Sequence, residues 1–226
     1  MPNRLTATCT RCGATHEVPV WPLIRVGDDP SLKARVKDGS LFVWTCPRCG
    51  AANLARYQTL YHDPGARLMV WLLPSGVVSP EEQDSVERRL NDLSAQLKGG
   101  DPLDGYTLRR VDDVGSLIEK VNIFDAGLDD IVLEICKYVT RLELAEKADD
   151  PAQAAALMDA PFKFYRMEGA DNEIILTFPE EGQMKAVNIG FNVYEDGRRI
   201  LSRNSSVRLS GGFARVDAAW LEQFFR

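Results

Sequence analysis

The stretches Cys9-Thr10-Arg11-Cys12-Gly13 and Cys46-Pro47-Arg48-Cys49-Gly50 carry the strongest structural signal in this chain of 226 residues. Each is a CxxCG knuckle, in which two cysteines project from one tight turn and the following glycine lets the backbone curl. Four thiolates from two such turns fit a tetrahedral Zn²⁺ ion with Zn–S distances of about 2.3 Å. The spacing therefore predicts one structural zinc ion, with the ligands Cys9, Cys12, Cys46 and Cys49.

A site made of four thiolates has no open coordination position for water or substrate, which is typical of structural zinc and not of catalytic zinc. A dithiol redox pair is the alternative, because CxxC motifs also occur in thiol oxidoreductases. That alternative requires a CxxC that opens a helix, whereas both knuckles here lie between predicted strands. We therefore favour a structural metal site.

The composition is that of a globular protein, with 45% hydrophobic and 27% charged residues. Five cysteines make a poor disulfide framework for a chain of this length, and in a reducing compartment paired cysteines more often bind metal. The fifth, Cys136, lies in an apolar helical pattern and is expected to be a buried small hydrophobe. No apolar run approaches the roughly 18–20 residues that span a bilayer, and the first residues lack a secretory signal, so we expect a cytoplasmic protein without membrane contact.

The net charge of −6 is unevenly distributed along the chain. Residues 1–78 carry +4, residues 79–150 carry −9 and residues 151–226 carry −1. Because a zinc ion with four thiolates carries about −2, the net charge of residues 1–78 falls to about +2. This charge is too small to favour binding to a phosphate backbone. Binding to a protein partner is therefore favoured. Nucleic-acid binding stays open as an alternative, through Arg11 and Arg48 at the knuckle tips with Trp44 beside them.

The pattern of residues 1–78 predicts a zinc-ribbon-like β head. Strands are expected around each knuckle, and a short helix at residues 28–36 lies in the 33-residue insert that separates the knuckles. Two further β-rich runs, at residues 54–61 and 67–73, flank a sequence with strong turn chemistry and predict a hairpin.

Residues 79–226 are expected to form a second domain, with a helical segment followed by an antiparallel β-rich lobe and a terminal helix. The whole chain is thus predicted to be α+β. Helical spacing of apolar residues predicts helices at residues 80–98 and after the acidic residues Asp113, Asp129 and Asp150. From Phe162 the apolar period changes to 2, which predicts strands at residues 162–167, 173–178, 186–194 and 205–209, before a last helix that follows Asp217.

Few side chains could support catalysis. His16 and His62 are the only histidines. His16 follows the first knuckle by four positions and is expected near the metal or at the surface, although it could substitute as a ligand. His62 precedes Asp63, which could orient the imidazole, but a turn there favours local hydrogen bonding. An enzyme with a site between the lobes remains an alternative, without a substrate. The pairs Asp112-Asp113 and Asp129-Asp130 are explained as helix N-caps.

Four segments together resemble one known family. They are CTRCG at residues 9–13, DPSLKARVKDGSLFVWTCPRCG at 29–50, LYHD at 60–63 and RRVDDVGSLIEKVNIFDAGLDDIVLEICK at 109–137. This order resembles the CpXC domain family of bacterial proteins, although Thr10 stands where a proline would be expected. The resemblance implies a zinc-ribbon-like head, a helical middle and a β-rich tail, and it implies no particular activity.

Overall fold

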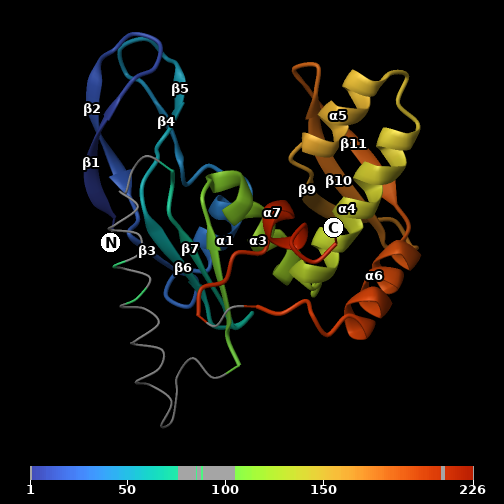
Figure 1. Cartoon of the computed structure of the whole chain (residues 1–226). Helices are drawn as coiled ribbons and strands as arrows, with labels where there is room; N and C mark the ends of the chain where they lie inside the picture. Colours follow the sequence, from blue (N-terminus) through green and yellow to red (C-terminus); the bar gives the residue numbers. More distant parts are fainter. Residues whose placement is uncertain (1, 76–84, 86–87, 89–104, 210–211, 226) are drawn as a thin grey trace. The chain divides into compact units, whose positions relative to one another are not determined.

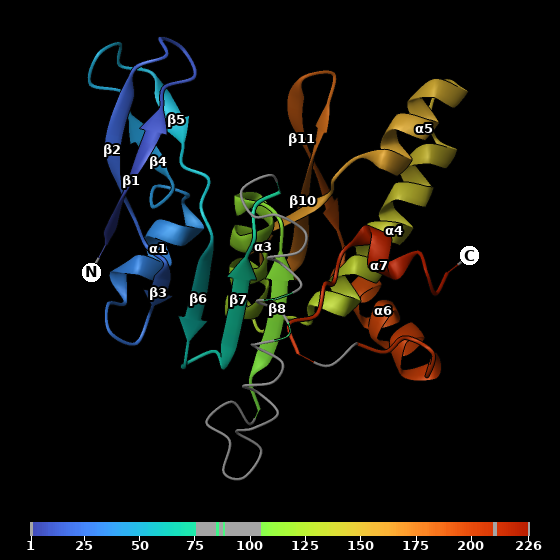
Figure 2. The same ribbon diagram turned by 60° about the vertical axis from the view of Figure 1, so that its left-hand side comes forward.

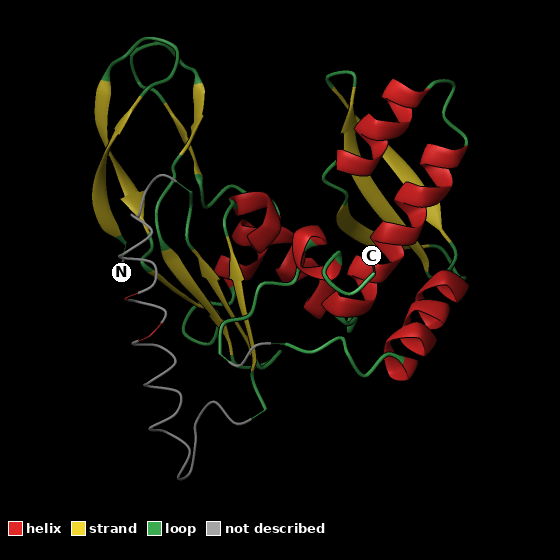
Figure 3. Ribbon diagram, viewed as in Figure 1, coloured by secondary structure: helices red, strands yellow, loops and turns green. Residues whose placement is uncertain are grey.

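The computed structural model describes residues 2–75, 85, 88, 105–209 and 212–225. The chain divides into two compact units, Met1–Val121 with Ser210–Arg215 and Asn122–Leu209 with Val216–Arg226. Each unit contains both helices and antiparallel strands (Figure 3), which confirms the predicted α+β class. Among the described residues, no helix is both long and apolar enough to cross a bilayer.

Two short antiparallel ribbons in the first unit present the cysteine knuckles, and they lie side by side in Figures 1 and 2. One ribbon pairs β1 (Asn3–Thr8) with β2 (Thr15–Val20), and the other pairs β4 (Val43–Thr45) with β5 (Ala52–Leu54). Each ribbon turns back at a CxxCG sequence. Each knuckle is therefore the tip of a hairpin, which confirms the prediction that strands flank both knuckles.

A four-stranded mixed sheet forms the middle of the first unit, in the order β3-β6-β7-β8 (Figure 2). The strands are β3 (Leu23–Arg25), β6 (Thr59–Asp63), β7 (Leu68–Leu72) and β8 (Thr107–Val111). β6 and β7 form the predicted hairpin, whereas β3 runs parallel to β6 and β8 runs parallel to β7. The prediction that residues 62 and 63 lie in the turn is wrong, because β6 continues through Asp63 and the turn begins at Pro64.

Two helices accompany this sheet. α1 (Ser31–Lys37) buries Leu32 and Val36, and α3 (Val114–Asp125) buries Leu117 and Val121. The N-terminus of α3 is held by the Asp113 carboxylate, which accepts a 2.8 Å hydrogen bond from the backbone N–H of Ser116. Capping by Asp113 is thus confirmed, whereas Asp112 instead forms a 2.9 Å ion pair with Arg215.

The first unit extends beyond the 1–78 head expected from the sequence. β8 adds to the sheet through its parallel register with β7, and α3 follows β8 directly. Residues near the C-terminus also return to this unit, since the backbone N–H of Arg110 donates a 3.0 Å hydrogen bond to the carbonyl of Ala214. The helix predicted at residues 80–98 falls outside the described part of the chain, except for residues 85 and 88.

The second unit packs helices on one face of an antiparallel sheet (Figure 3). The sheet has the order β11-β10-β9, with β9 (Lys163–Glu168), β10 (Glu173–Glu180) and β11 (Gln183–Ile189). The helices are α4 (Asp130–Glu146), α5 (Pro151–Asp159) and α6 (Phe191–Arg203). Leu133, Leu157, Phe178 and Tyr194 are among the residues that join these elements in one apolar core.

Helix N-caps in the second unit follow the sequence prediction. The Asp129 carboxylate accepts a hydrogen bond from the backbone N–H of Ile131 and caps α4. The Asp150 carboxylate accepts one from the backbone N–H of Gln153 and caps α5. Asp217 caps α7 (Ala218–Leu221), which is the predicted terminal helix in a shorter form. Cys136 is fully buried, and this burial raises the pKa of its thiol to about 12, so it is the packing residue that the sequence predicts.

Two strand predictions in this unit are wrong. Residues 186–194 were expected to be one strand, but β11 ends at Ile189 and α6 begins at Phe191. The alternation of apolar residues continues across this boundary at 187, 189, 191 and 193, so a period of 2 does not reveal where the helix begins. Residues 205–209 form turns and irregular structure instead of a strand.

Candidate metal centre

Both knuckles are built by the same hydrogen bonds. The N–H of the first cysteine donates to the carbonyl five residues later, at 2.8 Å for Cys9 and 2.9 Å for Cys46. The glycine N–H returns to the carbonyl of that first cysteine, at 3.0 Å for Gly13 and 2.8 Å for Gly50. These glycines have φ angles of +68° and +69°, a left-handed conformation that glycine adopts without steric cost.

The four cysteine sulfurs lie together, all within 4.8 Å of one another. Two contacts join opposite knuckles, with Cys9 Sγ 3.6 Å from Cys49 Sγ and Cys12 Sγ 3.7 Å from Cys46 Sγ. A tetrahedral site with Zn–S distances of about 2.3 Å has S···S edges of about 3.8 Å, whereas a disulfide bond is about 2.05 Å long. The cysteines are free thiols, and the two contacts between knuckles have the separation of neighbouring ligands in a tetrahedral site. In the described part of the chain, this is the cluster of His, Cys, Asp and Glu side chains able to hold a metal ion.

One polar side chain from each knuckle reaches across to the opposite knuckle. Asn53 Nδ2 lies 3.6 Å from Cys9 Sγ, and His16 Nε2 lies 3.5 Å from Cys46 Sγ. Both residues stand four positions after the second cysteine of their own knuckle, so the two contacts are equivalent. With a proton on Nε2, His16 donates to the thiolate as Asn53 does. Such hydrogen bonds stabilise the negative charge of a metal-bound thiolate.

Asn53 also ties the two knuckles together through its carbonyl. Its Oδ1 accepts hydrogen bonds from the backbone N–H of Thr10 at 2.9 Å and from the Thr10 hydroxyl at 3.0 Å. The equivalent position in the other knuckle is Pro47, which has no N–H to donate. Thr10 therefore has a structural role that its place in the turn did not predict. The sequence feature that could have revealed the role of Asn53 is its spacing, because it follows Cys49 by four positions as His16 follows Cys12.

The thiols of this cluster have divergent pKa values. Burial raises the pKa of Cys9, but the backbone N–H groups of Cys12 and Arg11 and the Asn53 amide outweigh it and lower that pKa to about 6. The backbone N–H of Ala51 lowers the pKa of Cys49, yet burial and the neighbouring sulfurs outweigh it and raise that pKa to about 12. Four sulfurs this close do not all ionise by themselves, and a divalent cation supplies the charge that lets them do so.

The other candidate functional residues do not form one site: His16 and Trp44 lie beside the cysteine cluster, and His62 and Asp63 lie in β6. His16 packs edge-on against Trp44, with ring centroids 5.9 Å apart, while Arg11 and Arg48 are exposed at the knuckle tips. His62 and Asp63 do not work together, because successive strand residues project to opposite faces.

His62 stacks on the Tyr106 ring, and its Nε2 lies 3.1 Å from the Tyr106 hydroxyl. Asp63 is buried and forms a 3.1 Å ion pair with Lys33. The two residues thus have different partners, and no imidazole is oriented by a carboxylate at this position.

Comparison with known proteins assigns the family. Residues 7–137 match the family described as CpXC protein, which is more than half of the chain. The chain belongs to the CpXC family. The match covers both knuckles, the four-stranded sheet and α3, and it ends within α4, so the β9–β11 sheet lies outside it. No curated protein and no solved structure matches this CpXC protein.

Proposed function

We propose that Cys9, Cys12, Cys46 and Cys49 bind one zinc ion that stabilises the first unit and performs no chemistry. The support is the set of sulfur separations, which fit a tetrahedral site, and the donor set, which fills all four positions of such a site. Tetrahedral sulfur ligands also suit iron. A colourless protein with one equivalent of zinc would distinguish the two metals, since iron–sulfur sites absorb visible light.

We further propose that the metal-bound ribbons form a non-enzymatic binding module for a protein partner in the cytoplasm. The observation that carries this proposal is an exposed apolar pair on the second ribbon. Val43 and Leu54 lie directly opposite each other in the β4–β5 register, and each is 49% exposed. Apolar side chains that remain exposed together on a surface are typical of protein interfaces.

The test is to retain partners from the native host on the wild-type protein and on a Val43→Ser/Leu54→Ser variant, with identification by mass spectrometry. The proposal expects a specific partner that the variant loses while its zinc content stays the same. Met184→Ser is the matched control, because Met184 is an apolar residue of the second unit that is 67% exposed. Equal retention by the double variant and the wild type would contradict the proposal.

Nucleic-acid binding is the second candidate, and the exposure of Arg11 and Arg48 at the two knuckle tips favours it. Salt-dependent retention on RNA or DNA, abolished in Arg11→Glu/Arg48→Glu, would support this candidate. Retention that is absent at low salt would exclude it.

A further inference from the structure

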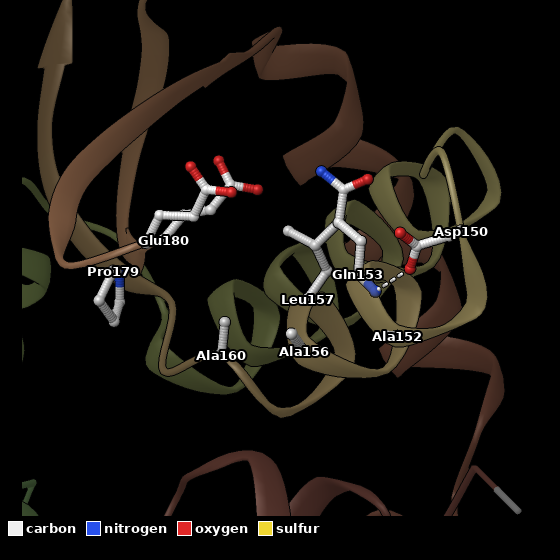
Figure 4. A pocket seen from close by; sticks show the side chains of 9 residues that line it. Asp150, Ala152, Gln153, Ala156, Leu157, Ala160, Pro179 and Glu180 are labelled. Carbon is white, nitrogen blue, oxygen red and sulfur yellow. Dashed lines mark hydrogen bonds between the residues drawn. The ribbon is translucent and has the colours of Figure 1, made fainter.

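The second unit contains a cavity between α5 and the β10–β11 turn, away from the cysteine knuckles in the sequence. Its volume is about 370 Å³, at the lower end of the range for small-ligand sites. Figure 4 shows it as an open space with Leu157, Ala156 and Ala160 on one side and Glu180 on the other. The cavity lies wholly within one compact unit.

The lining combines an apolar floor with a negative rim. Leu157, Ala156, Ala160 and Pro179 supply hydrocarbon, whereas the charged residues of the lining are all acidic: Asp150, Glu180 and Glu181. Within the described part of the chain, Glu180 and Glu181 form no ion pair. Two neighbouring carboxylates beside a hydrocarbon surface, with no ion-pair partner among the described residues, favour a ligand that is both cationic and aliphatic.

The turn that presents these carboxylates is unusual for its residue type. Glu181 has a φ of +50° and precedes Gly182 at +75° in a two-residue turn that Glu180 and Gln183 close. Such turns prefer Asn-Gly or Gly-Gly, because a longer side chain is strained at positive φ. A glutamate at this position keeps a second carboxylate at the rim at the expense of backbone strain.

The two ends of the cavity differ in what they can bind. Asp150 stands at the N-terminus of α5, where its Oδ1 already accepts a 2.8 Å hydrogen bond from the backbone N–H of Gln153. The positive end of the helix dipole disfavours a cation there. The cationic group therefore belongs beside Glu180 and Glu181, with its hydrocarbon stem along Leu157 and the alanines.

We propose that this cavity binds a primary alkylammonium group, either of a free aliphatic amine or of a lysine side chain in a peptide. The ammonium pairs with Glu180 and Glu181, and the methylene chain covers the floor at Leu157, Ala156 and Ala160. An anionic ligand is excluded by the three carboxylates of the rim. This inference is independent of the zinc site, since its residues belong to the other unit.

The experiment is a titration of the full-length protein followed by two-dimensional ¹H–¹⁵N NMR, with two separate probes. One is 1,5-diaminopentane, and the other is acetyl-Gly-Lys-Gly-amide, with the neutral norleucine peptide as the control ligand. The proposal expects saturable shifts at the amides of Gln153, Leu157 and Glu181, which weaken as salt is added. It expects no saturable shifts with the norleucine peptide.

Two variants test the two halves of the site. Glu180→Gln/Glu181→Gln removes the charge, and Ala156→Leu fills the floor with a residue that favours helix; each is expected to weaken binding at least tenfold. Asp171→Asn/Glu173→Gln removes two charges at the opposite end of β10 and should change the affinity less than twofold. Binding of the diamine alone assigns the site to small amines, and binding of the peptide assigns it to a lysine side chain. The inference would be overturned if neither probe bound saturably, or if the Asp171/Glu173 variant lost as much affinity as the Glu180/Glu181 variant.

Discussion

Asn53 shows how one residue couples two knuckles that are far apart in sequence. Its amide group contacts the Cys9 sulfur, accepts two hydrogen bonds from Thr10 and donates to the carbonyl of Ala51 at 2.9 Å. It is only 6% exposed. All of its hydrogen-bonding groups are therefore used inside the site, where loss of a partner is costly. His16 makes the corresponding contact with Cys46, without a donor at Pro47 to fix it further.

Asn53→Ala is expected to reduce zinc affinity by about 10–100-fold, the usual effect of removing a group that orients metal ligands. Competition with a chromophoric chelator measures this affinity. Asn3→Ala is the control, because Asn3 is an exposed asparagine on the adjacent ribbon. If Asn53→Ala binds zinc within twofold of the wild type, Asn53 has no part in holding the site.

Asp63 makes a pH-dependent contribution to stability. Burial raises the pKa of its carboxyl, but the backbone N–H of Ala66 and the Lys33 ammonium outweigh this and hold the pKa below its ordinary value. A carboxyl whose pKa is lowered by folding stabilises the protein above its unfolded-state pKa, and this is lost as the pH falls through its folded-state pKa.

We therefore expect Asp63→Asn to lower the free energy of unfolding by about 2 kcal/mol at pH 7. The difference from the wild type should shrink below about pH 4. Urea unfolding at several pH values measures this. Asp28→Asn is the control, since the exposed Asp28–Arg25 pair at 3.6 Å contributes under about 1 kcal/mol. A difference that stays constant down to pH 2 would show that the charge of Asp63 is not the cause.

At the scale of elements, local signals predicted more than patterns that depend on tertiary packing. The knuckles, the hairpin of β6 and β7 and the caps at Asp113, Asp129 and Asp150 are all set by neighbouring residues, and each is present in the structure. The start of α6 was missed because apolar alternation continues into its first turn. The contacts of Asn53 with Cys9 and Thr10, and the cavity between α5 and the β10–β11 turn, join residues that are distant in sequence. No local sequence pattern reveals them.

The crossing of α4 and α6 depends on a glycine. A Cβ at Gly197 would lie 3.1 Å from Val132 Cγ1 and 3.4 Å from Cys136 Sγ, so the two helices approach too closely for a larger residue. Gly197→Val is expected to destabilise the second unit by about 1–3 kcal/mol through overpacking. Thermal unfolding checks this, with Ser202→Val on the exposed face of α6 as the control. If the two variants have the same stability, the helices separate without cost.

At the scale of the molecule, the chain joins a unit that carries the four-cysteine cluster to a unit with its own apolar core. The CpXC match covers the first unit nearly completely and stops within α4. The core of the second unit is made of α4, α5, α6 and the β9–β11 sheet, and none of its residues is a candidate metal ligand. The two units should therefore respond differently when the metal is removed.

Chelation is expected to unfold the ribbons and to leave the second unit largely folded, because the small ribbons depend on the metal for stability. Hydrogen exchange with a strong chelator measures this segment by segment. Protection should fall at residues 3–20 and 43–54, while α4 and the β10 strand keep theirs. Equal loss of protection in both units would contradict a local role for the metal.

The most direct test of the metal centre is zinc K-edge X-ray absorption on the purified protein, with the metal content measured on the same sample. The four-cysteine site predicts one zinc ion per chain with four sulfur neighbours at about 2.3 Å. A spectrum that requires nitrogen or oxygen ligands, or a protein that retains no zinc while its cysteines are reduced, would contradict it.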